Sequence, residues 1–230
     1  MDPTRTDEAV LDRAPWASLV GAHAHLAEAR GRARRYRPDV SPFAALEDPA
    51  DPGAWADLAA LVGPGGSVAL PGVDEPGPGW EVERRFDVVQ MVAGDVAAAG
   101  ATHAVLGDAD VPAMLELTAR TRPGPFLPAT NAMGTYLGVR DGGALVAMAG
   151  ERLRPPGWTE ISAVCTDPSA RGRGLAGALV RELVGRARAR GDASLLHVLG
   201  TNAGALGLYE HLGFRVRGRI TILDCRVTAA

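Results

Sequence analysis

The chain has 230 residues, of which 47% are hydrophobic and 22% charged, as expected for one large or two small globular domains with a proper core. All 24 basic residues are arginines, which excludes the lysine of a P-loop and any Schiff-base lysine of a pyridoxal mechanism. Residues 1–127 carry 11 arginines against 19 acidic residues, and residues 128–230 carry 13 against 8. The positive second half favours a small polyanionic ligand, and no basic stripe with interleaved aromatics indicates a nucleic acid.

The sequence also predicts where the protein resides. No run approaches the roughly 18 apolar residues that a membrane span needs, and the acidic N-terminus does not resemble a signal peptide. Cys165 and Cys225 are 60 positions apart and form no disulfide framework, so both are expected to be reduced thiols in the core. We therefore expect a cytoplasmic protein with no membrane partner.

Residues 1–103 show mixed helical and strand patterns and contain no obvious chemical constellation. They predict an α/β lobe that packs on the second half. The expected elements are helices at residues 19–35 and 51–62 and strands at residues 67–70 and 82–92.

Two features of this lobe could hold a ligand. An arginine-rich run could bind an anion, although a solvated face is favoured; it consists of Arg32, Arg34, Arg35 and Arg37. His23 and His25 have no companion carboxylate or cysteine, so no metal site is predicted.

The second half predicts an α/β (α+β) fold with a mixed, mostly antiparallel sheet flanked by helices. Turn signals at residues 141–143 and 155–157 join three antiparallel strands. The rigid loop at residues 122–128 either walls a pocket or simply connects two elements. The expected strands are at residues 104–106, 135–140, 144–151, 158–166, 194–199 and 214–224, and the expected helices at residues 108–120 and 203–211, with one more after the turn described next.

A glycine-rich turn at residues 167–177 joins a β-branched strand pattern to a long amphipathic helix pattern. A strand that enters a helix through such a turn leaves backbone N–H groups unpaired. Glycine lets a ligand approach that backbone closely, and the helix dipole favours negative charge there. The turn therefore predicts a phosphate or pyrophosphate site. The apolar face of the helix after it consists of Leu175, Leu179, Val180, Leu183, Val184 and Ala187.

A dinucleotide fingerprint is an alternative interpretation of the same glycines. Gly172, Gly174 and Gly177 have the required spacing, and Asp192 follows Gly172 by 20 residues. In a dinucleotide fold, however, that carboxylate ends a strand, whereas Asp192 precedes one. Too few strands and helices follow the turn for that fold, and the strands before it are joined by hairpins. This alternative is disfavoured.

Two linked motifs point to a known family. The first is Arg171-x-x-Gly174-x-Ala176, and the second runs from Asn202 to Gly213-Phe214 with Ala205, Leu208 and Tyr209 at fixed spacing. In this order they resemble the Arg/Gln-x-x-Gly-x-Gly/Ala loop and the Asn-x-x-Ala-x-x-Leu-Tyr-x-x-x-Gly-Phe helix of the GNAT superfamily of N-acetyltransferases. The resemblance covers about residues 104–224. It implies a GNAT acetyltransferase domain at residues 104–230, and the lobe at residues 1–103 would be an addition or a degenerate GNAT-like half.

The resemblance implies acetyl-coenzyme A as cosubstrate, with no metal. Backbone N–H groups of the turn would hold the pyrophosphate, the strand before it would pair with the pantetheine, and a bulge in that strand would free an N–H for the thioester carbonyl. Asn202 would cap its helix and touch the cofactor. The implied cofactor-binding residues are Ala163, Val164, Cys165, Arg171, Gly172, Arg173, Gly174, Leu175, Ala176, Gly177 and Asn202.

Transfer of an acetyl group to an amine needs two proton movements. Glu160 is the candidate general base, directly or through a water, and Tyr209 is the candidate general acid for the departing sulfur. Glu151 and Asp141 are weaker candidates for the base. His197 is expected to be a core histidine with its hydrogen bonds satisfied.

The acceptor cannot be identified from the sequence beyond a small-molecule or peptide amine. It is expected between the N-terminal lobe, the loop at residues 122–128 and the first strands, in a monomer or a homodimer. The alternative function is a non-catalytic acyl-CoA-binding regulatory module that keeps the GNAT fold.

Overall fold

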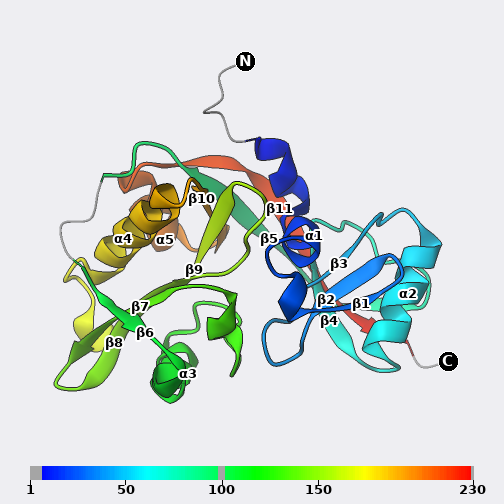
Figure 1. The fold of residues 1–230 in the computed structure, drawn as a ribbon, viewed down its shortest axis with the longest axis horizontal. Helices are drawn as coiled ribbons and strands as arrows, with labels where there is room; N and C mark the ends of the chain where they lie inside the picture. The colour runs from blue at the N-terminus through cyan, green and yellow to red at the C-terminus, as the bar shows by residue number, and fades with distance from the viewer. Residues whose placement is uncertain (1–6, 98–101, 229–230) are drawn as a thin grey trace. The chain divides into compact units, whose positions relative to one another are not determined.

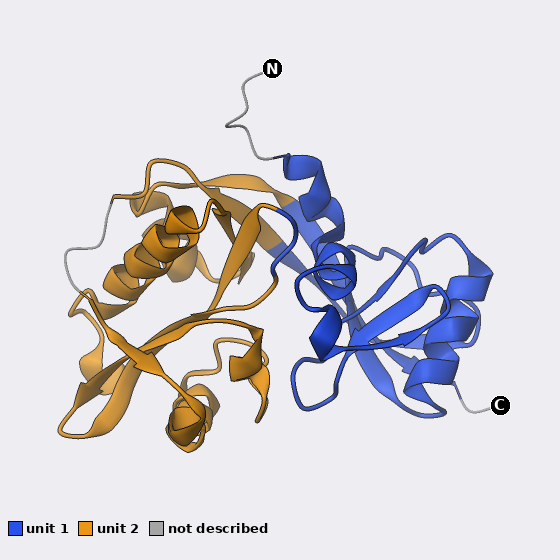
Figure 2. Ribbon diagram, viewed as in Figure 1, with its two compact units in different colours: residues 1–88, 154–156, 219–230 blue, residues 89–153, 157–218 orange. Residues whose placement is uncertain are grey.

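The computed structural model describes residues 7–97 and 102–228. The chain divides into two compact units, which Figure 2 shows in separate colours. Unit 1 comprises residues 1–88, 154–156 and 219–230, and unit 2 comprises residues 89–153 and 157–218. The expected boundary at 103/104 therefore differs from the division between the units, because the C-terminal residues belong with the N-terminal unit.

Unit 1 contains a small three-stranded sheet in the order β1-β2-β3, with antiparallel pairing. Its core is built around α2, whose Trp55 and Leu58 pack with Leu70 and with Leu223 and Cys225 of the last strand. The N-terminus of α2 is capped by Asp51, which accepts a hydrogen bond from the Gly53 N–H at 2.8 Å. The elements of this unit are η1 (Glu8–Arg13), α1 (Ala14–Val20), η2 (Ala24–Leu26), β1 (Ala27–Arg30), β2 (Ala33–Tyr36), β3 (Ala44–Leu46), α2 (Pro52–Val62) and β4 (Ser67–Pro71).

The helix expected at residues 19–35 is wrong. Helix α1 ends at Val20, and the arginine-rich run forms the hairpin of β1 and β2 instead. Gly31, at a φ of 44°, makes the turn of this hairpin. Ala33 and Tyr36, which lie on opposite faces of β2, are both buried, so tertiary packing outweighs the helix propensity of an alanine- and arginine-rich segment.

Unit 2 carries most of an eight-stranded sheet, in the order β4-β11-β5-β10-β9-β8-β7-β6 (Figure 1). The pairs β6–β7, β7–β8, β8–β9 and β4–β11 are antiparallel, and β9–β10 is parallel. Strands β5 (Trp80–Ala93) and β11 (Phe214–Val227) run from one unit into the other. The remaining elements are β6 (Ala104–Leu106), η3 (Asp108–Asp110), α3 (Val111–Thr121), η4 (Thr130–Met133), β7 (Tyr136–Asp141), β8 (Ala144–Glu151), β9 (Trp158–Thr166), η5 (Pro168–Ala170), α4 (Leu175–Ala189), β10 (Ala193–Leu199) and α5 (Ala203–His211).

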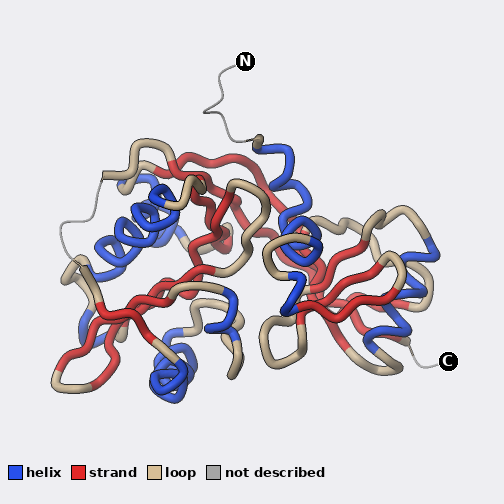
Figure 3. Tube along the Cα trace, viewed as in Figure 1, coloured by secondary structure: helices blue, strands red, loops and turns tan. Residues whose placement is uncertain are grey.

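Helices cover both faces of the sheet in unit 2 (Figure 3). On one face, α4 and α5 pack through Leu179, Leu183 and Leu212 against Ile161 and Leu196. On the other face, α3 packs through Met114 and Leu117 against Met148 and Cys165. The mixed, mostly antiparallel sheet flanked by helices confirms the expected fold class.

Cys165 and Cys225 are both buried free thiols. In the described part of the chain, no helix combines the length and the apolar character that a membrane crossing requires.

Candidate active site

Strands β9 and β10 separate part-way along their length. Their parallel pairing begins at Trp158 and Ala193 and ends at Ile161 opposite Leu196, although β9 continues to Thr166 and β10 to Leu199. The two strands therefore form a fork, which is open between residues 162–166 and residues 197–199.

A bulge distorts β9 at the open end of the fork. Met148 of β8 pairs with Cys165 and Gly150 pairs with Ser162, so two residues of β9 lie opposite one residue of β8. Ala163 takes a φ of 52°, a left-handed conformation that non-glycine residues rarely adopt. Bulges of this kind redirect backbone groups, and this one lies in the strand where the resemblance implies it.

The turn after β9 carries a row of free backbone donors. Asp167 caps η5, accepting hydrogen bonds from the Ser169 N–H at 3.0 Å and its hydroxyl at 2.7 Å. The first amide of α4 that donates to a carbonyl is Ala178, to Gly174 at 3.1 Å. Across residues 7–97 and 102–228, the N–H groups of residues 172–177 have no acceptor. We call these six groups the N–H row; they can receive the oxygens of a phosphate chain.

The glycines of the turn have two different roles. Gly172 and Gly174 have φ values of 76° and 74°, and a Cβ built on either would meet no atom within 4 Å. They are therefore required by backbone conformation and leave the space in front of the N–H row open. Gly177 instead lies on the buried face of α4, where a Cβ would make ordinary contacts at 3.5 Å with Arg181 and with Leu212 after α5, so neither conformation nor space requires glycine at this position.

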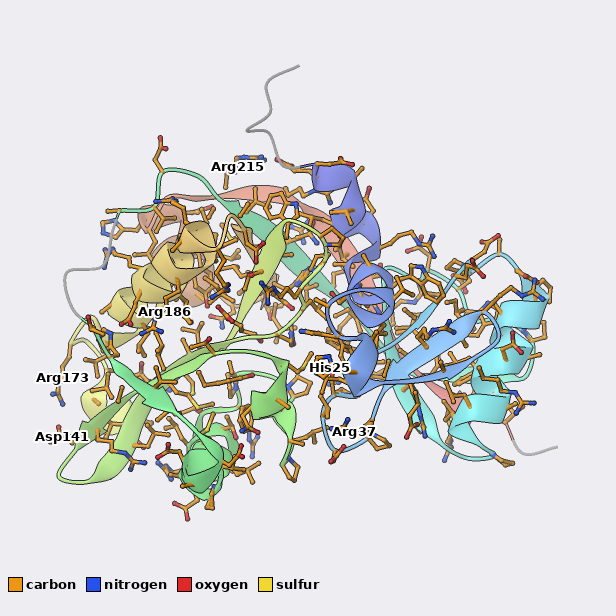
Figure 4. All side chains as sticks on the ribbon, in the orientation of Figure 1. His25, Arg37, Asp141, Arg173, Arg186 and Arg215 are labelled. Atoms are coloured by element: carbon orange, nitrogen blue, oxygen red, sulfur yellow. The ribbon has the colours of Figure 1, made fainter. Side chains whose placement is uncertain are left out.

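The two arginines of the turn are exposed and differ in their partners. Arg173 donates to Asp141 of the β7–β8 turn at 2.7 Å, and Figure 4 shows these two side chains next to each other. Arg171 donates from its Nε to the Thr166 carbonyl at 3.4 Å, and its own N–H contacts the Pro168 carbonyl at 3.4 Å. Its backbone is therefore partly engaged, whereas its guanidinium stays at the surface.

Helix α5 brings the second motif to the same region. Asn202 caps α5, accepting a hydrogen bond from the Ala205 N–H at 3.1 Å. Tyr209 is buried and packs edge-to-face on Phe214, with ring centroids 5.9 Å apart. It shares a core cluster with Val164 at the bulge and Leu175 at the start of α4.

The Tyr209 hydroxyl is held in its neutral form. Burial, with a smaller contribution from Cys165, raises the pKa of Tyr209 to about 12. Among the described residues it has no hydrogen-bond partner. A protonated donor without a partner therefore lies beside the strand that carries the bulge.

Glu160 lies on β9, and its side chain is fully buried. Its carboxylate accepts hydrogen bonds from the Arg152 guanidinium at 2.9 and 2.5 Å, the Leu153 N–H at 3.2 Å and the His197 Nδ1 at 2.7 Å. Burial acts to raise the pKa of Glu160, but the charge of Arg152 and the hydrogen bonds from Arg152 and His197 outweigh it and hold the pKa well below its usual range. Glu160 was expected to be a carboxylate free to accept a proton. In the structure its oxygens already accept hydrogen bonds and its pKa is low, and both features disfavour direct proton uptake by Glu160.

The hydrogen bonds beyond Glu160 define the protonation state of His197. Arg217 can only donate, and it donates to the Gln90 Oε1 at 2.8 Å. The Gln90 amide nitrogen therefore faces the His197 Nε2, at 2.9 Å. His197 thus accepts at Nε2 and donates from Nδ1 to Glu160, which is the neutral imidazole with its proton on Nδ1. Both ring nitrogens of His197 thus have hydrogen-bond partners, as the sequence analysis expected.

The other carboxylates considered as bases also have partners. Glu151 is buried, paired with Arg190 at 2.6 Å, and accepts from the Thr135 N–H at 3.0 Å. Asp141 is exposed and paired with Arg173. Asp192 precedes β10 and accepts from the Thr159 hydroxyl at 2.8 Å, so it does not end a strand as a dinucleotide fold would require.

Breaking the buried ion pair should destabilise the protein strongly. Arg152→Met leaves the Glu160 carboxylate buried without its bidentate partner, and we expect a loss of about 3–5 kcal/mol in the free energy of unfolding. Urea unfolding at pH 7, followed by circular dichroism, measures this loss. Arg226→Met is a matched control, because Arg226 pairs with Glu81 at an exposed position; it should cost under about 1 kcal/mol. Equal stability of the two variants would contradict the network described for Glu160.

Sequence reasoning missed three members of this network, Arg152, Gln90 and Arg217. Gln90 carried a signal, because it is the one polar residue in the apolar run at residues 88–92 and proves fully buried. Arg152 gave no signal, because nothing in the sequence indicates that its side chain meets Glu160 across the β8–β9 hairpin. Arg217 gave none, because its partner Gln90 lies on a strand distant in sequence.

Comparisons with known proteins agree with this geometry. A family model described as FR47-like protein matches residues 136–222. A crystal structure from Novosphingobium aromaticivorans, described as an acetyltransferase of the GNAT family, is 41% identical with a TM-score of 0.87, covering 96% of this chain and 99% of that one. The chain belongs to the GNAT family of acetyltransferases.

Two curated GNAT relatives match over shorter stretches. The N-alpha-acetyltransferase RimI of Mycobacterium tuberculosis is 42% identical over 83 residues, which are 35% of this chain and 51% of that protein. The mycothiol acetyltransferase of Beutenbergia cavernae is 44% identical over 73 residues, which are 31% of this chain and 25% of that protein. The matched stretches thus span about half of the first protein and a quarter of the second.

Proposed function

We propose that the protein transfers an acetyl group from acetyl-CoA directly to a primary amine. The observation that carries the proposal is the N–H row at the start of α4, next to the bulged, open end of the fork. A diphosphate needs several converging donors, and a pantetheine arm needs an unpaired strand edge; both lie in unit 2 within one short stretch of chain.

Each implied cofactor contact has a place in the proposal. Residues 172–177 would bind the pyrophosphate through their N–H groups, and the Arg171 and Arg173 side chains would add charge-assisted hydrogen bonds. The backbone of Ala163, Val164 and Cys165 would pair with the pantetheine. Asn202 would contact the cofactor from the cap of α5. When bound, acetyl-CoA supplies an acyl group activated as a thioester.

The reaction also requires that a proton be removed from the acceptor ammonium and that one be donated to the departing sulfur. An alkylammonium with a pKa near 10.4 loses its proton at pH 7 at a cost of about 4.6 kcal/mol. The proposal assigns proton acceptance to Glu160 and the groups bound to it, and donation toward the departing sulfur to Tyr209. The pKa of Tyr209, raised to about 12, keeps the donor protonated at any neutral pH.

The acceptor is proposed only as a small-molecule or peptide amine. One curated relative is named an N-alpha-acetyltransferase and the other a mycothiol acetyltransferase, so the relatives do not point to a single acceptor. A cytoplasmic location is part of the proposal, supported by two thiols that remain unpaired.

One observation favours a second candidate function, a non-catalytic acyl-CoA-binding module. The Glu160 carboxylate has four hydrogen-bond donors and no accessible surface, so the proposed base is not free to act alone. Such a module would keep the N–H row and bind the cofactor without turnover.

Calorimetry followed by a thiol-release assay tests both functions. Acetyl-CoA should bind, NADH should not, and release of free thiol should depend on one class of amine in a panel of α-amines, ε-amines and amino sugars. Tight binding with no thiol release on any amine would support the module instead. Binding of NADH without acetyl-CoA would reject both.

A further inference from the structure

Five side chains, two of them buried and three partly buried, form a continuous chain of hydrogen bonds in unit 2. We call it the Glu160 network; its members, in order, are Arg152, Glu160, His197, Gln90 and Arg217. Arginines remain charged at any accessible pH, and the pKa of Glu160 is held low. The imidazole of His197, whose Nε2 carries a lone pair, is therefore the member of this network that can accept a proton.

His197 is placed at the junction of the fork. It is the first residue of β10 beyond the last pair, Ile161 and Leu196, and thus lies where the bulged part of β9 diverges. The side chain of His197 is 11% exposed, against 0% for Glu160. Of the two, the imidazole is the group closer to solvent.

We propose that His197 is the proton acceptor of the reaction and that Glu160 is a positioning residue that acts through it. This inference rests on the proposed function. One N–H bond of the acceptor ammonium breaks, its electron pair stays on nitrogen, and the proton forms an N–H bond at the His197 Nε2. The imidazolium then passes this proton to solvent.

The contacts of His197 supply what this step needs. Glu160 holds the proton on Nδ1, which presents the Nε2 lone pair, and its charge stabilises the imidazolium. The charged groups around the ring are Glu160, with Arg152 behind it, and Arg217 behind Gln90. In the resting network the Gln90 amide nitrogen donates to Nε2 and its Oε1 accepts from Arg217, so proton uptake from the acceptor requires the Gln90 side chain to move away from both His197 and Arg217.

Two substitutions separate this role from a structural one. His197→Gln keeps hydrogen-bonding groups at the site but takes up no proton at pH 7; we expect kcat to fall about 100-fold with an unchanged Kd for acetyl-CoA. Gln90→Glu places a carboxylate opposite Nε2, which stabilises the imidazolium, and should move the acid limb of kcat/KM up by about one pH unit. A histidine that only packs would leave that limb in place.

A measurement independent of turnover completes the test. Nitrogen-15 NMR of the whole chain, with His197 assigned from the His197→Gln spectrum, should show the Nδ1–H tautomer and titration between about pH 5 and 9. An unprotonated Nδ1, a ring that does not titrate in this range, or full kcat in His197→Gln would overturn the inference. If the unchanged chain binds acetyl-CoA but acetylates no amine, the proposed function fails, and the NMR titration alone then decides the chemistry of His197.

Discussion

Tyr209→Phe should lower kcat about 100-fold while leaving the Kd for acetyl-CoA within a factor of about two. The substitution removes one hydroxyl and keeps the ring that packs on Phe214, so the fold should persist. The loss falls on kcat because the Tyr209 hydroxyl has no hydrogen-bond partner among residues 7–97 and 102–228 and would act only on the departing sulfur. Stopped-flow thiol detection under saturating acetyl-CoA measures it.

Tyr136→Phe is the matched control. Tyr136 is also a buried tyrosine of unit 2, and its hydroxyl has no hydrogen-bond partner among the described residues. Its removal should leave kcat unchanged and should not lower the melting temperature, because an unpaired buried hydroxyl is costly. Equal losses in the two variants would show that the effect at Tyr209 is one of packing rather than proton donation.

The pH profile gives a second check on Tyr209. Because burial raises the pKa of Tyr209 to about 12, the neutral donor persists as the pH increases, and it is lost only near that value. The rate should therefore show no basic limb below about pH 10. A basic limb near pH 9 that disappears in Tyr209→Phe would contradict the environment described for this residue.

Gly174→Val should weaken acetyl-CoA binding at least tenfold. Gly174 has a φ of 74° at the start of α4, a conformation that costs a non-glycine residue about 1–2 kcal/mol and a β-branched residue more. The strain is relieved by moving the turn, and a moved turn no longer aligns the N–H row. Isothermal titration calorimetry with acetyl-CoA measures the change.

Gly185→Val is the control for this substitution. Gly185 lies in the same helix, is exposed, has no positive φ, and would bring a Cβ into open space. The variant should bind acetyl-CoA as the unchanged chain does. If Gly174→Val kept its affinity, the assignment of the N–H row to the pyrophosphate would be wrong.

Many elements of unit 2 could be predicted because short sequence signals specify where they begin and end. The turns at residues 141–143 and 155–157, the glycines at residues 172 and 174, and the Asn202 cap each specify a conformation within a few residues. The structure confirms the hairpins and the helices that these signals predict. It also shows both the bulge at Ala163 and the fork, although only the family resemblance indicated the bulge in advance.

The rest depended on contacts distant in sequence. The segment at residues 19–35 has the composition of a helix, and only its packing under α2 makes it a hairpin. Glu160 was placed on the correct strand, but its burial follows from Arg152 and His197, which approach it through two separate strand connections. The hydrophobic periodicity of a strand indicates which face a residue occupies. It does not indicate which charged side chains from other segments contact that residue.

The passage of β5 and β11 through both units has a consequence for how the protein is made. Leu223 and Cys225, near the end of the chain, complete the core around Trp55 and Leu70. On the ribosome, the first 88 residues therefore emerge long before the strand that seals their hydrophobic interior. Residues 89–218, more than half of the polypeptide, are made between the two main parts of unit 1, so the core of this unit cannot be completed until that stretch has been synthesised.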